Sequence, residues 1–297
     1  MNGVYTFSND LYPVVTKRFQ DNLDDKEMLI KQLINTDSIG TESMTLEGMG
    51  GYGVLPVYDG TTIANLDQSR GYKTTVTPVE RSGSASISYK KAKVDMSGEA
   101  KKIGSKLAKS CTITLTRDFY NLFANGWNSD YKYGDGVSLF NASHPRSTTD
   151  ASVFSNTGTT AFSIAALSAT EGRIQRWKAF DDTEFDANLD LVLVSPELAP
   201  TARSYFGDDA RLIPDSAENG ANPHKDVKWF VIKGLSAKQW IAGDSALMKE
   251  YLHYIYITKP MVLMNKTDNP LITKYIAYMD YAFAASDPRC VFGHNPA

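Results

Sequence analysis

The sequence predicts an α+β protein, and three patterns along the chain indicate this class. A stripe of apolar residues at helical spacing runs through residues 95–125. Residues 160–245 then combine helical patterns with short apolar runs of the kind found in buried strands. Residues 246–297 alternate apolar and polar side chains over two stretches, which predicts β-strands.

The opening segment, residues 1–47, is mostly polar and irregular. Only Met28–Leu33 has the apolar content of a short helix. A segment with so little apolar surface cannot fold alone, because burial does not offset the entropy lost on ordering. We therefore expect an arm that is disordered or lies on another surface.

Residues 48–92 are rich in glycine at first and strand-like afterwards. Gly71–Val79 and Ser84–Lys90 are predicted to pair as a hairpin, with Glu80–Gly83 as the turn. An isolated two-stranded hairpin is only marginally stable in water. This hairpin is therefore expected to extend from the molecule and to gain stability by lying on a neighbouring subunit.

The strongest periodic signal predicts one long helix. A local alternation from Cys111 to Thr116 favours a strand instead, but the helical stripe continues through both flanks, so we expect a helix. Gly104 inside it costs up to ~1 kcal/mol relative to alanine. Asn125–Gly126 is expected to end the helix. The residues of the stripe are Ala100, Ile103, Leu107, Cys111, Leu115, Phe119 and Leu122.

Residues 160–245 predict an α/β arrangement. Ser163 can cap one helix, and Pro196 suits the first position of another. The polar stretch from Phe206 to Lys228 predicts a long surface loop. The stretches expected as strands, here and towards the C-terminus, are Leu189–Val194, Trp229–Ile232, Tyr251–Ile257 and Tyr275–Phe283.

The bulk composition excludes several classes of protein. With 42% hydrophobic and 22% charged residues, the chain is not wholly disordered. Its formal net charge of -3 argues against a dedicated nucleic-acid binder, which usually carries a basic excess. No stretch approaches ~20 consecutive apolar residues, so we expect no membrane span, and the N-terminus lacks the pattern of a signal peptide. Cys111 and Cys290 have no metal-ligand spacing and are expected to be buried thiols.

Two motifs resemble ligand sites, and a structural interpretation is preferred for each. Gly48–Gly53 matches the letters GxGxxG, but a dinucleotide site needs a strand before the motif and a helix after it. We expect a flexible glycine junction instead. An acidic cluster further on lacks the glycine that a calcium loop places at its sixth position, so a solvated loop is expected. The members of this cluster are Asp181, Asp182, Glu184, Asp186 and Asp190.

Lysines on the polar side of the long helix could contact nucleic acid. Because the chain is net acidic, a solvated face or ion pairs between subunits is the preferred interpretation. These residues are Lys101, Lys102, Lys106 and Lys109.

His144 follows Ser143 and lies nine positions after Asp135, which raises the hypothesis of a Ser/His/Asp hydrolase. A catalytic triad is defined by geometry and not by proximity in sequence. The chain has no GxSxG motif to present a nucleophile. Asp135–Gly136 instead predicts a tight turn, and Pro145 predicts an extended backbone at His144.

Several segments, taken in order, resemble the major capsid proteins of tailed bacteriophages, which share the Hong Kong 97-like fold. The resemblance covers the chain from about Gly48 to Ala297. Besides the glycine segment, the predicted hairpin and the helix from Glu99 to Phe123, three motifs carry it. They are Gly134-Asp135-Gly136-Val137-Ser138-Leu139-Phe140 with Ser143-His144-Pro145, the strand and helix around Leu191–Pro196, and Asp287-Pro288-Arg289 with Val291-Phe292-Gly293.

The resemblance implies five regions in an α+β capsid fold. Residues 1–47 would form an N-terminal arm and 48–92 the extended β-hairpin loop. Residues 93–150 would form a peripheral domain with the long spine helix, and 151–245 an α/β axial domain. Residues 246–297 would return as a β-rich segment through the peripheral domain to the axial domain.

The resemblance also implies a function. The chain would be a major capsid protein, without catalysis, cofactor or metal, that self-assembles into an icosahedral shell of hexamers and pentamers around viral DNA. An encapsulin-type compartment shell is the alternative, and a hydrolase using His144 is a remote one. We expect the location to be the virion capsid, with assembly in the host cytoplasm.

The expected partners follow from the same resemblance. They are further copies of the chain, a portal protein, a decoration protein and packaged DNA held non-specifically, with no membrane. We also expect a separate scaffolding protein, because the 47 residues before the glycine segment are too few for a cleavable scaffold domain.

Overall fold

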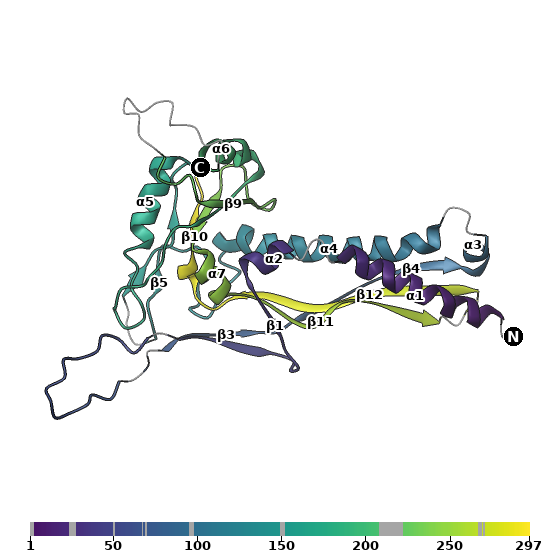
Figure 1. The fold of residues 1–297 in the computed structure, drawn as a ribbon, viewed down its shortest axis with the longest axis horizontal. Helices are drawn as coiled ribbons and strands as arrows, with labels where there is room; N and C mark the ends of the chain where they lie inside the picture. Colours follow the sequence, from purple (N-terminus) through teal and green to yellow (C-terminus); the bar gives the residue numbers. More distant parts are fainter. Residues whose placement is uncertain are drawn as a thin grey trace. The chain divides into compact units, whose positions relative to one another are not determined.

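The computed structural model describes residues 3–23, 28–49, 51–66, 68, 70–94, 98–148, 152–207, 222–266, 269 and 271–297. The chain forms two compact units, and each is built from three stretches of sequence (Figure 1). The first unit takes Met1–Met44, Val76–Phe119 and Tyr254–Phe283. The second unit takes Thr45–Thr75, Tyr120–His253 and Ala284–Ala297.

The first unit contains a four-stranded sheet in the order β1-β11-β12-β4. Its strands are β1 (Asn35–Ser38), β11 (Leu252–Lys266), β12 (Ile272–Ala285) and β4 (Val79–Ser88). The helices of this part of the chain are α1 (Gly3–Leu23), α2 (Met28–Leu33), α3 (Tyr89–Lys93) and α4 (Glu99–Ala124).

The predicted long helix is confirmed as α4, with Leu107, Cys111, Leu115 and Phe119 buried. It packs on the sheet, where Tyr281 donates a hydrogen bond of 2.8 Å to Asp118. The threonines that favoured a strand bond within the helix instead, to carbonyl oxygens four residues earlier. The short 3₁₀ helix η1 (Asn125–Trp127) follows α4, where the helix was expected to end.

Helix α1 differs from the expected irregular arm. Val15 and Phe19 are fully buried, and they lie against Gly104 of α4. A Cβ atom at position 104 would overlap the carbonyl oxygen of Val15, so the glycine permits a close helix-to-helix approach. Pro13 inside α1 concealed the helix in the sequence, because proline normally marks a helix boundary.

The predicted pairing of Gly71–Val79 with Ser84–Lys90 is wrong. The residues expected as a turn, Glu80–Gly83, lie inside β4, which pairs antiparallel with β12 from Val79–Tyr281 to Ser88–Ile272. A partner strand 184 or more residues away therefore outcompeted the local turn, which has no glycine at its two central positions. The extended two-stranded element exists, but its strands are β2 (Met44–Met49) and β3 (Arg70–Val76).

The second unit is built on a five-stranded sheet in the order β7-β13-β10-β8-β9. Strand β10 is antiparallel to both β8 and β13, whereas β8–β9 and β13–β7 are parallel. A core that includes Leu167, Ile174, Val192, Val194 and Trp240 packs on this sheet. The strands are β7 (Thr157–Gly158), β8 (Leu191–Val194), β9 (Lys228–Val231), β10 (Trp240–Gly243) and β13 (Val291–His294).

Most predicted elements of this unit are confirmed. Ser163 caps α5 (Ile164–Ile174) by accepting a hydrogen bond from the amide of Ala166. Pro196 opens a 3₁₀ turn, η2 (Pro196–Leu198), which continues as α6 (Ala199–Tyr205). Of the expected loop from Phe206 to Lys228, residues 208–221 lie outside the described residues. The remaining elements are β5 (His144–Pro145), β6 (Val153–Phe154), α7 (Ser245–Tyr251) and η3 (Pro288–Cys290).

No helix in the described part of the chain is long and apolar enough to cross a membrane.

Candidate functional site

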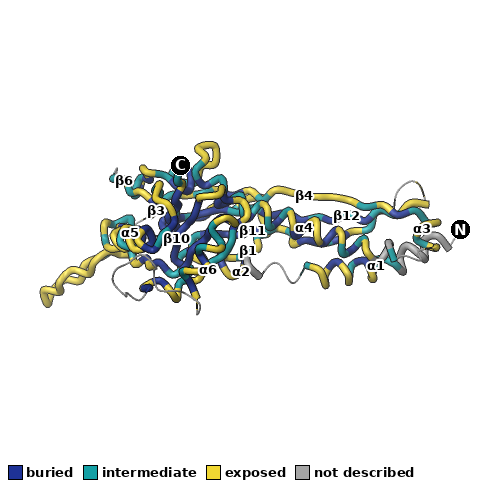
Figure 2. The backbone as a smooth tube through the Cα atoms, turned by 90° about the horizontal axis from the view of Figure 1, so that it is seen from above, coloured by how far each residue is buried: buried dark blue, intermediate teal, exposed yellow. Residues whose placement is uncertain are grey.

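A long loop connects β2 to β3, and it forms a long exposed stretch in the described part of the second unit (Figures 1 and 2). Every residue from 51 to 65 is exposed. We call residues 51–66 the projecting loop. Val57, Ile63 and Val54 are 97%, 87% and 81% exposed, and Tyr52, Leu55 and Tyr58 are also exposed. Because soluble proteins rarely expose so many large apolar side chains together, this loop indicates an interaction surface.

The projecting loop has local structure but no apolar core. Asp59 accepts hydrogen bonds from the amides of Thr61 and Thr62, at 2.8 and 2.9 Å. Gly53 and Gly60 have φ angles of 73° and 89°, which favour glycine. Within the predicted junction, Gly48 instead ends up in strand β2, whereas Gly53 turns the chain. Among the described residues, strand β3 follows, and not the helix that a dinucleotide site would require.

The second unit also buries a polar cluster around His144, whose side chain is 1% exposed. Nδ1 of His144 lies 2.5 Å from Oδ2 of Asp135, and Nε2 lies 3.0 Å from Oδ1 of Asn156. Asp135 sits in the tight turn predicted there, with Gly136 at a φ angle of 82°. His144 lies in the extended strand β5, as Pro145 predicted.

The hydrogen bonds of Asn156 fix the orientation of its amide group. Nδ2 donates to the carbonyl oxygen of Leu139 at 2.7 Å, and Oδ1 accepts from the amide of Asn141 at 2.9 Å. Oδ1 is therefore an acceptor towards His144, and the carboxylate of Asp135 is an acceptor on the other side. Both ring nitrogens of His144 therefore face oxygen atoms of neighbouring side chains.

This geometry does not form a nucleophile–base pair. The two ring nitrogens of His144 are engaged by Asp135 and Asn156, and Ser143 is exposed while the ring is buried. A general base needs an open nitrogen within reach of the hydroxyl that it deprotonates. The cluster instead joins the turn before β5 to the segment before β7.

A second buried polar group lies at the motif Asp287-Pro288-Arg289. Both charged side chains are 1% exposed. Nε of Arg289 donates to Asp287 at 3.0 Å and Nη2 donates at 2.5 Å, while Nη1 donates to the carbonyl oxygen of Lys178 at 2.7 Å. The guanidinium carbon lies 3.8 Å from the ring centre of Phe180. The buried charges are thus paired and hydrogen-bonded, as burial requires.

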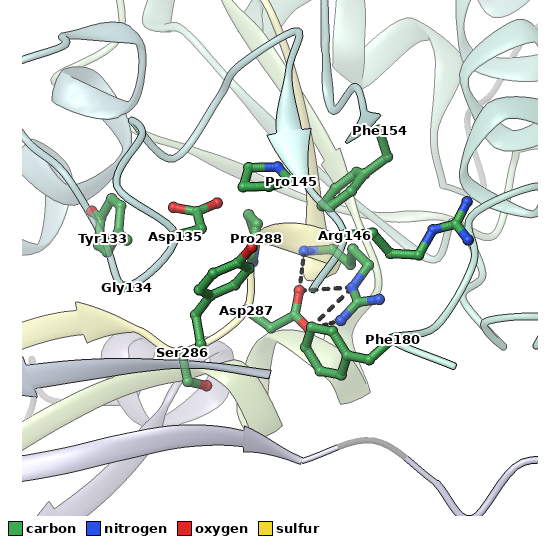
Figure 3. A pocket seen from close by; sticks show the side chains of 12 residues that line it. Tyr133, Gly134, Asp135, Pro145, Arg146, Phe154, Phe180, Ser286, Asp287 and Pro288 are labelled. Atoms are coloured by element: carbon green, nitrogen blue, oxygen red, sulfur yellow. Dashed lines mark hydrogen bonds and ion pairs between the residues drawn. The ribbon is translucent and has the colours of Figure 1, made fainter. Parts of the chain in front are cut away.

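The two polar groups line a common cavity of about 20 Å³, which has room for about one water molecule (Figure 3). Asp135, Asp287 and Arg289 contribute to its wall, together with Tyr72 and Phe180. Such a volume is far below the ~300 Å³ at which ligand pockets begin. The cavity is therefore a packing feature.

The acidic cluster is dispersed by the fold. Asp181 accepts from the hydroxyl and amide of Thr183, and Asp182 pairs with Arg146 at 2.5 Å. Asp190 accepts from the amide and hydroxyl of Ser245 at the start of α7. Across the described ranges, no three acidic, histidine or cysteine side chains are grouped as metal ligands.

Both thiols are buried and free, as expected. Burial raises the pKa of Cys111 to about 11, and it also raises the pKa of Cys290. Neither thiol is therefore activated as a nucleophile. Lys102, Lys106 and Lys109 of α4 are exposed, whereas the side chain of Lys101 lies outside the described residues.

Sequence reasoning did not single out Asn156 or Phe180. Neither residue belongs to a motif. Asn156 also donates to the carbonyl oxygens of Pro288 and Val291, and Phe180 stacks with Arg289, each more than 100 residues away. Arg289 stood in a noted motif, and its spacing of two residues from Asp287 was the available signal of a pair.

Comparison with known proteins identifies the family of this chain. A family model described as phage capsid protein matches residues 71–293, which is most of the chain. The chain belongs to this family. Its function is that of a shell-forming major capsid protein of the bacteriophage head, as the resemblance in the sequence implied.

Solved capsid structures share the fold at low sequence identity. The procapsid of bacteriophage JBD30 aligns with a TM-score of 0.55 and 13% identity, over 97% of this chain and 75% of that one. The capsid of a native GTA particle aligns at 0.53 and 12%, over 90% and 89%. The holo-SrpI encapsulin of Synechococcus elongatus aligns at 0.54 and 10%, over 93% and 88%. No curated protein matches the chain in sequence.

Proposed function

We propose that this capsid protein builds an icosahedral shell of hexamers and pentamers, and that the projecting loop bridges neighbouring copies. The observation that carries the proposal is the set of large apolar side chains exposed on residues 51–66. The loop buries none of them against its own unit, so their burial on a second copy would release ~25 cal/mol per Å² of apolar surface. Repetition over every subunit turns this modest contribution into a stable shell.

The experiment replaces the exposed apolar residues of the loop by serine. A variant carrying Val54→Ser, Leu55→Ser, Val57→Ser and Ile63→Ser is expected to remain a folded subunit that forms no shells, as seen by negative-stain electron microscopy. A matched control removes exposed apolar side chains elsewhere, through Val94→Ser, Ile113→Ser and Val153→Ser. Normal shells from the loop variant, or equal loss in both variants, would refute the role given to the loop.

We propose further that the protein carries no catalysis. The engaged ring nitrogens of His144 and the small cavity beside it support this. We expect the native protein to have no hydrolytic activity, and a His144→Gln variant to assemble into shells as the native protein does. A hydrolytic activity that the native protein has and this variant lacks would overturn the proposal.

A separate scaffolding protein, a portal protein and a decoration protein are proposed as partners. Helix α1 supports the separate scaffold, because its buried Val15 and Phe19 make it part of the folded first unit instead of a removable extension. Intact mass spectrometry of subunits from mature particles is expected to retain residues 3–34. Loss of this segment on maturation would contradict the proposal.

The contents of the particle distinguish the phage head from the encapsulin alternative. The similarity of fold to the Synechococcus encapsulin keeps a protein compartment as the alternative to a phage head. We propose that the protein is located in the virion capsid, where the particles hold DNA bound non-specifically, and that the particles are assembled in the host cytoplasm. Particles purified from the native source that contain a protein cargo and no DNA would favour the encapsulin reading.

A further inference from the structure

The turn formed by residues 178–184 lies against the base of the projecting loop. The backbones of Lys178 and Glu184 form an antiparallel β-bridge, and the amide of Ala179 donates to the carbonyl oxygen of Thr183 at 2.9 Å. Asp182 adopts a φ angle of 64° at the tip, the only positive φ of a non-glycine residue in the described part of the chain. The turn is thus a tight hairpin that presents Phe180 and Asp181.

The ring of Phe180 covers both strands from which the loop emerges. A Cβ atom added at Gly48 of β2 would lie 3.1 Å from the ring, and one added at Gly71 of β3 would overlap it. The two glycines therefore make room for one aromatic ring across the strand pair. Its position restricts how the strands can splay or tilt.

Asp181 lies beside the next point of the loop base. Its Oδ2 would be 3.5 Å from a Cβ atom at Gly53, where the positive φ angle turns the chain into the loop. Burial raises the pKa of Asp181, but hydrogen bonds from Thr183 and the backbone of Gly53 outweigh it, and the net shift is downward. The carboxylate is thus kept charged next to the loop.

Arg289 holds this turn from the opposite side. Its guanidinium stacks on Phe180 at 3.8 Å and donates to the carbonyl oxygen of Lys178 at 2.7 Å. Asp287 fixes the guanidinium by charge-assisted hydrogen bonds. Phe180 is therefore fixed on one face by Arg289 while its other atoms contact the loop base.

We propose that residues 178–184 form a clamp that sets the direction of the projecting loop, with Phe180 as its positioning residue. The clamp prepares the loop for a second copy of the chain, because a preformed direction lowers the ordering entropy paid on association. This inference rests on the proposed role of the loop in assembly, but the clamp itself is measurable in the unassembled subunit.

The experiment measures the distance distribution between spin labels on the full-length subunit before assembly. Labels at Thr61→Cys, in the loop, and Val153→Cys, on the same unit, report the loop direction by pulsed electron resonance; both native thiols are buried. Phe180→Leu is expected to widen the distribution at least twofold and to slow shell formation. Phe185→Leu is the matched control, because Phe185 also lies near Arg289, at 4.9 Å, but no loop glycine meets its ring.

The two readouts separate the clamp from the role of the loop. A wider distribution with unchanged assembly would support the clamp and refute the loop's part in assembly. An unchanged distribution in Phe180→Leu, or equal widening in both variants, would overturn the clamp.

A size-complementation test provides a second measurement. Gly48→Ala alone is expected to displace the ring of Phe180 and widen the distribution, because the added methyl group meets chiefly that ring. In the Phe180→Leu background the same change is expected to add nothing. Additive widening by the two substitutions would contradict the clamp.

Discussion

Two regions of the second unit reverse the usual distribution of side chains. Around Arg289, Asp287 and His144, charged and polar groups are almost completely buried. In the projecting loop, large apolar side chains are 59% to 97% exposed. The buried charges are paired within the single subunit, whereas the apolar side chains of the loop stay largely exposed in the described structure. The free subunit is therefore complete in its core, whereas its loop still awaits a partner.

The largest effect is expected where the buried pair is broken. Arg289→Ala leaves Asp287 buried without its cation, and this is expected to lower the free energy of unfolding by about 3–5 kcal/mol. Denaturant unfolding of the unassembled subunit measures it. The control is Asp287→Asn with Arg289→Met, which removes both charges. Its loss of unfolding free energy is expected to be smaller. Equal losses in the two variants would show that the charge pairing contributes little.

The next effect concerns His294, which stacks on Trp240 at 4.0 Å and is 2% exposed. Burial, helped by Arg173, lowers the pKa of His294 to about 4. The folded subunit keeps the ring neutral, whereas the unfolded chain binds a proton below about pH 6.5. Stability from this residue is therefore present above pH 6.5 and lost as the pH falls towards 4, by about 3 kcal/mol.

The measurement is the pH dependence of the unfolding free energy between pH 7 and pH 4. His294→Phe keeps an aromatic ring without a titrating group, and it is expected to flatten the curve over that window. A slope that persists in His294→Phe would assign the acid sensitivity to other groups.

The smallest effect is expected at Asp280, a buried carboxylate that contrasts with the paired Asp287. It lies opposite Glu80 in the first unit, and its Oδ1 has no hydrogen-bond partner. Burial, and then the charge of Glu80, raises the pKa of Asp280. Such a group stabilises the fold least when ionised, so its contribution falls as the pH rises through its folded pKa.

Asp280→Asn is therefore expected to stabilise the subunit at pH 7, by a few tenths to about 1 kcal/mol, and to have no such benefit near pH 3. Thermal unfolding at the two values checks this. Destabilisation at pH 7 would indicate that the carboxylate has a stabilising partner.

Elements with a helical or strand period were predicted well from the sequence, whereas pairings between distant segments were predicted poorly. The apolar stripe predicted α4 because helical contacts lie within four residues of each other. The pairing of β4 was missed because its partner β12 is distant in sequence, and β10 was missed because four buried residues give no period. Helix α1 was missed because Pro13 lies inside it and because its buried residues pack on Gly104 of α4, which is distant in sequence.

The candidate site follows the same division. The turn at Asp135 and the extended His144 came from local signals, namely glycine and proline. Asn156 and Phe180 gave no such signal, since Asn156 also contacts Val291 and Phe180 contacts Gly48 and Gly71, which only the fold brings close. Gly48 and Gly71 could not reveal from the sequence the ring of Phe180 that covers them.

The most direct test of the central claim is a cryo-electron microscopy reconstruction of assembled particles. We expect residues 52–63 of each subunit to pack their apolar side chains against a second copy, while the buried pair of Asp287 and Arg289 is unchanged. A reconstruction in which this loop stays in solvent, away from any neighbour, would contradict it.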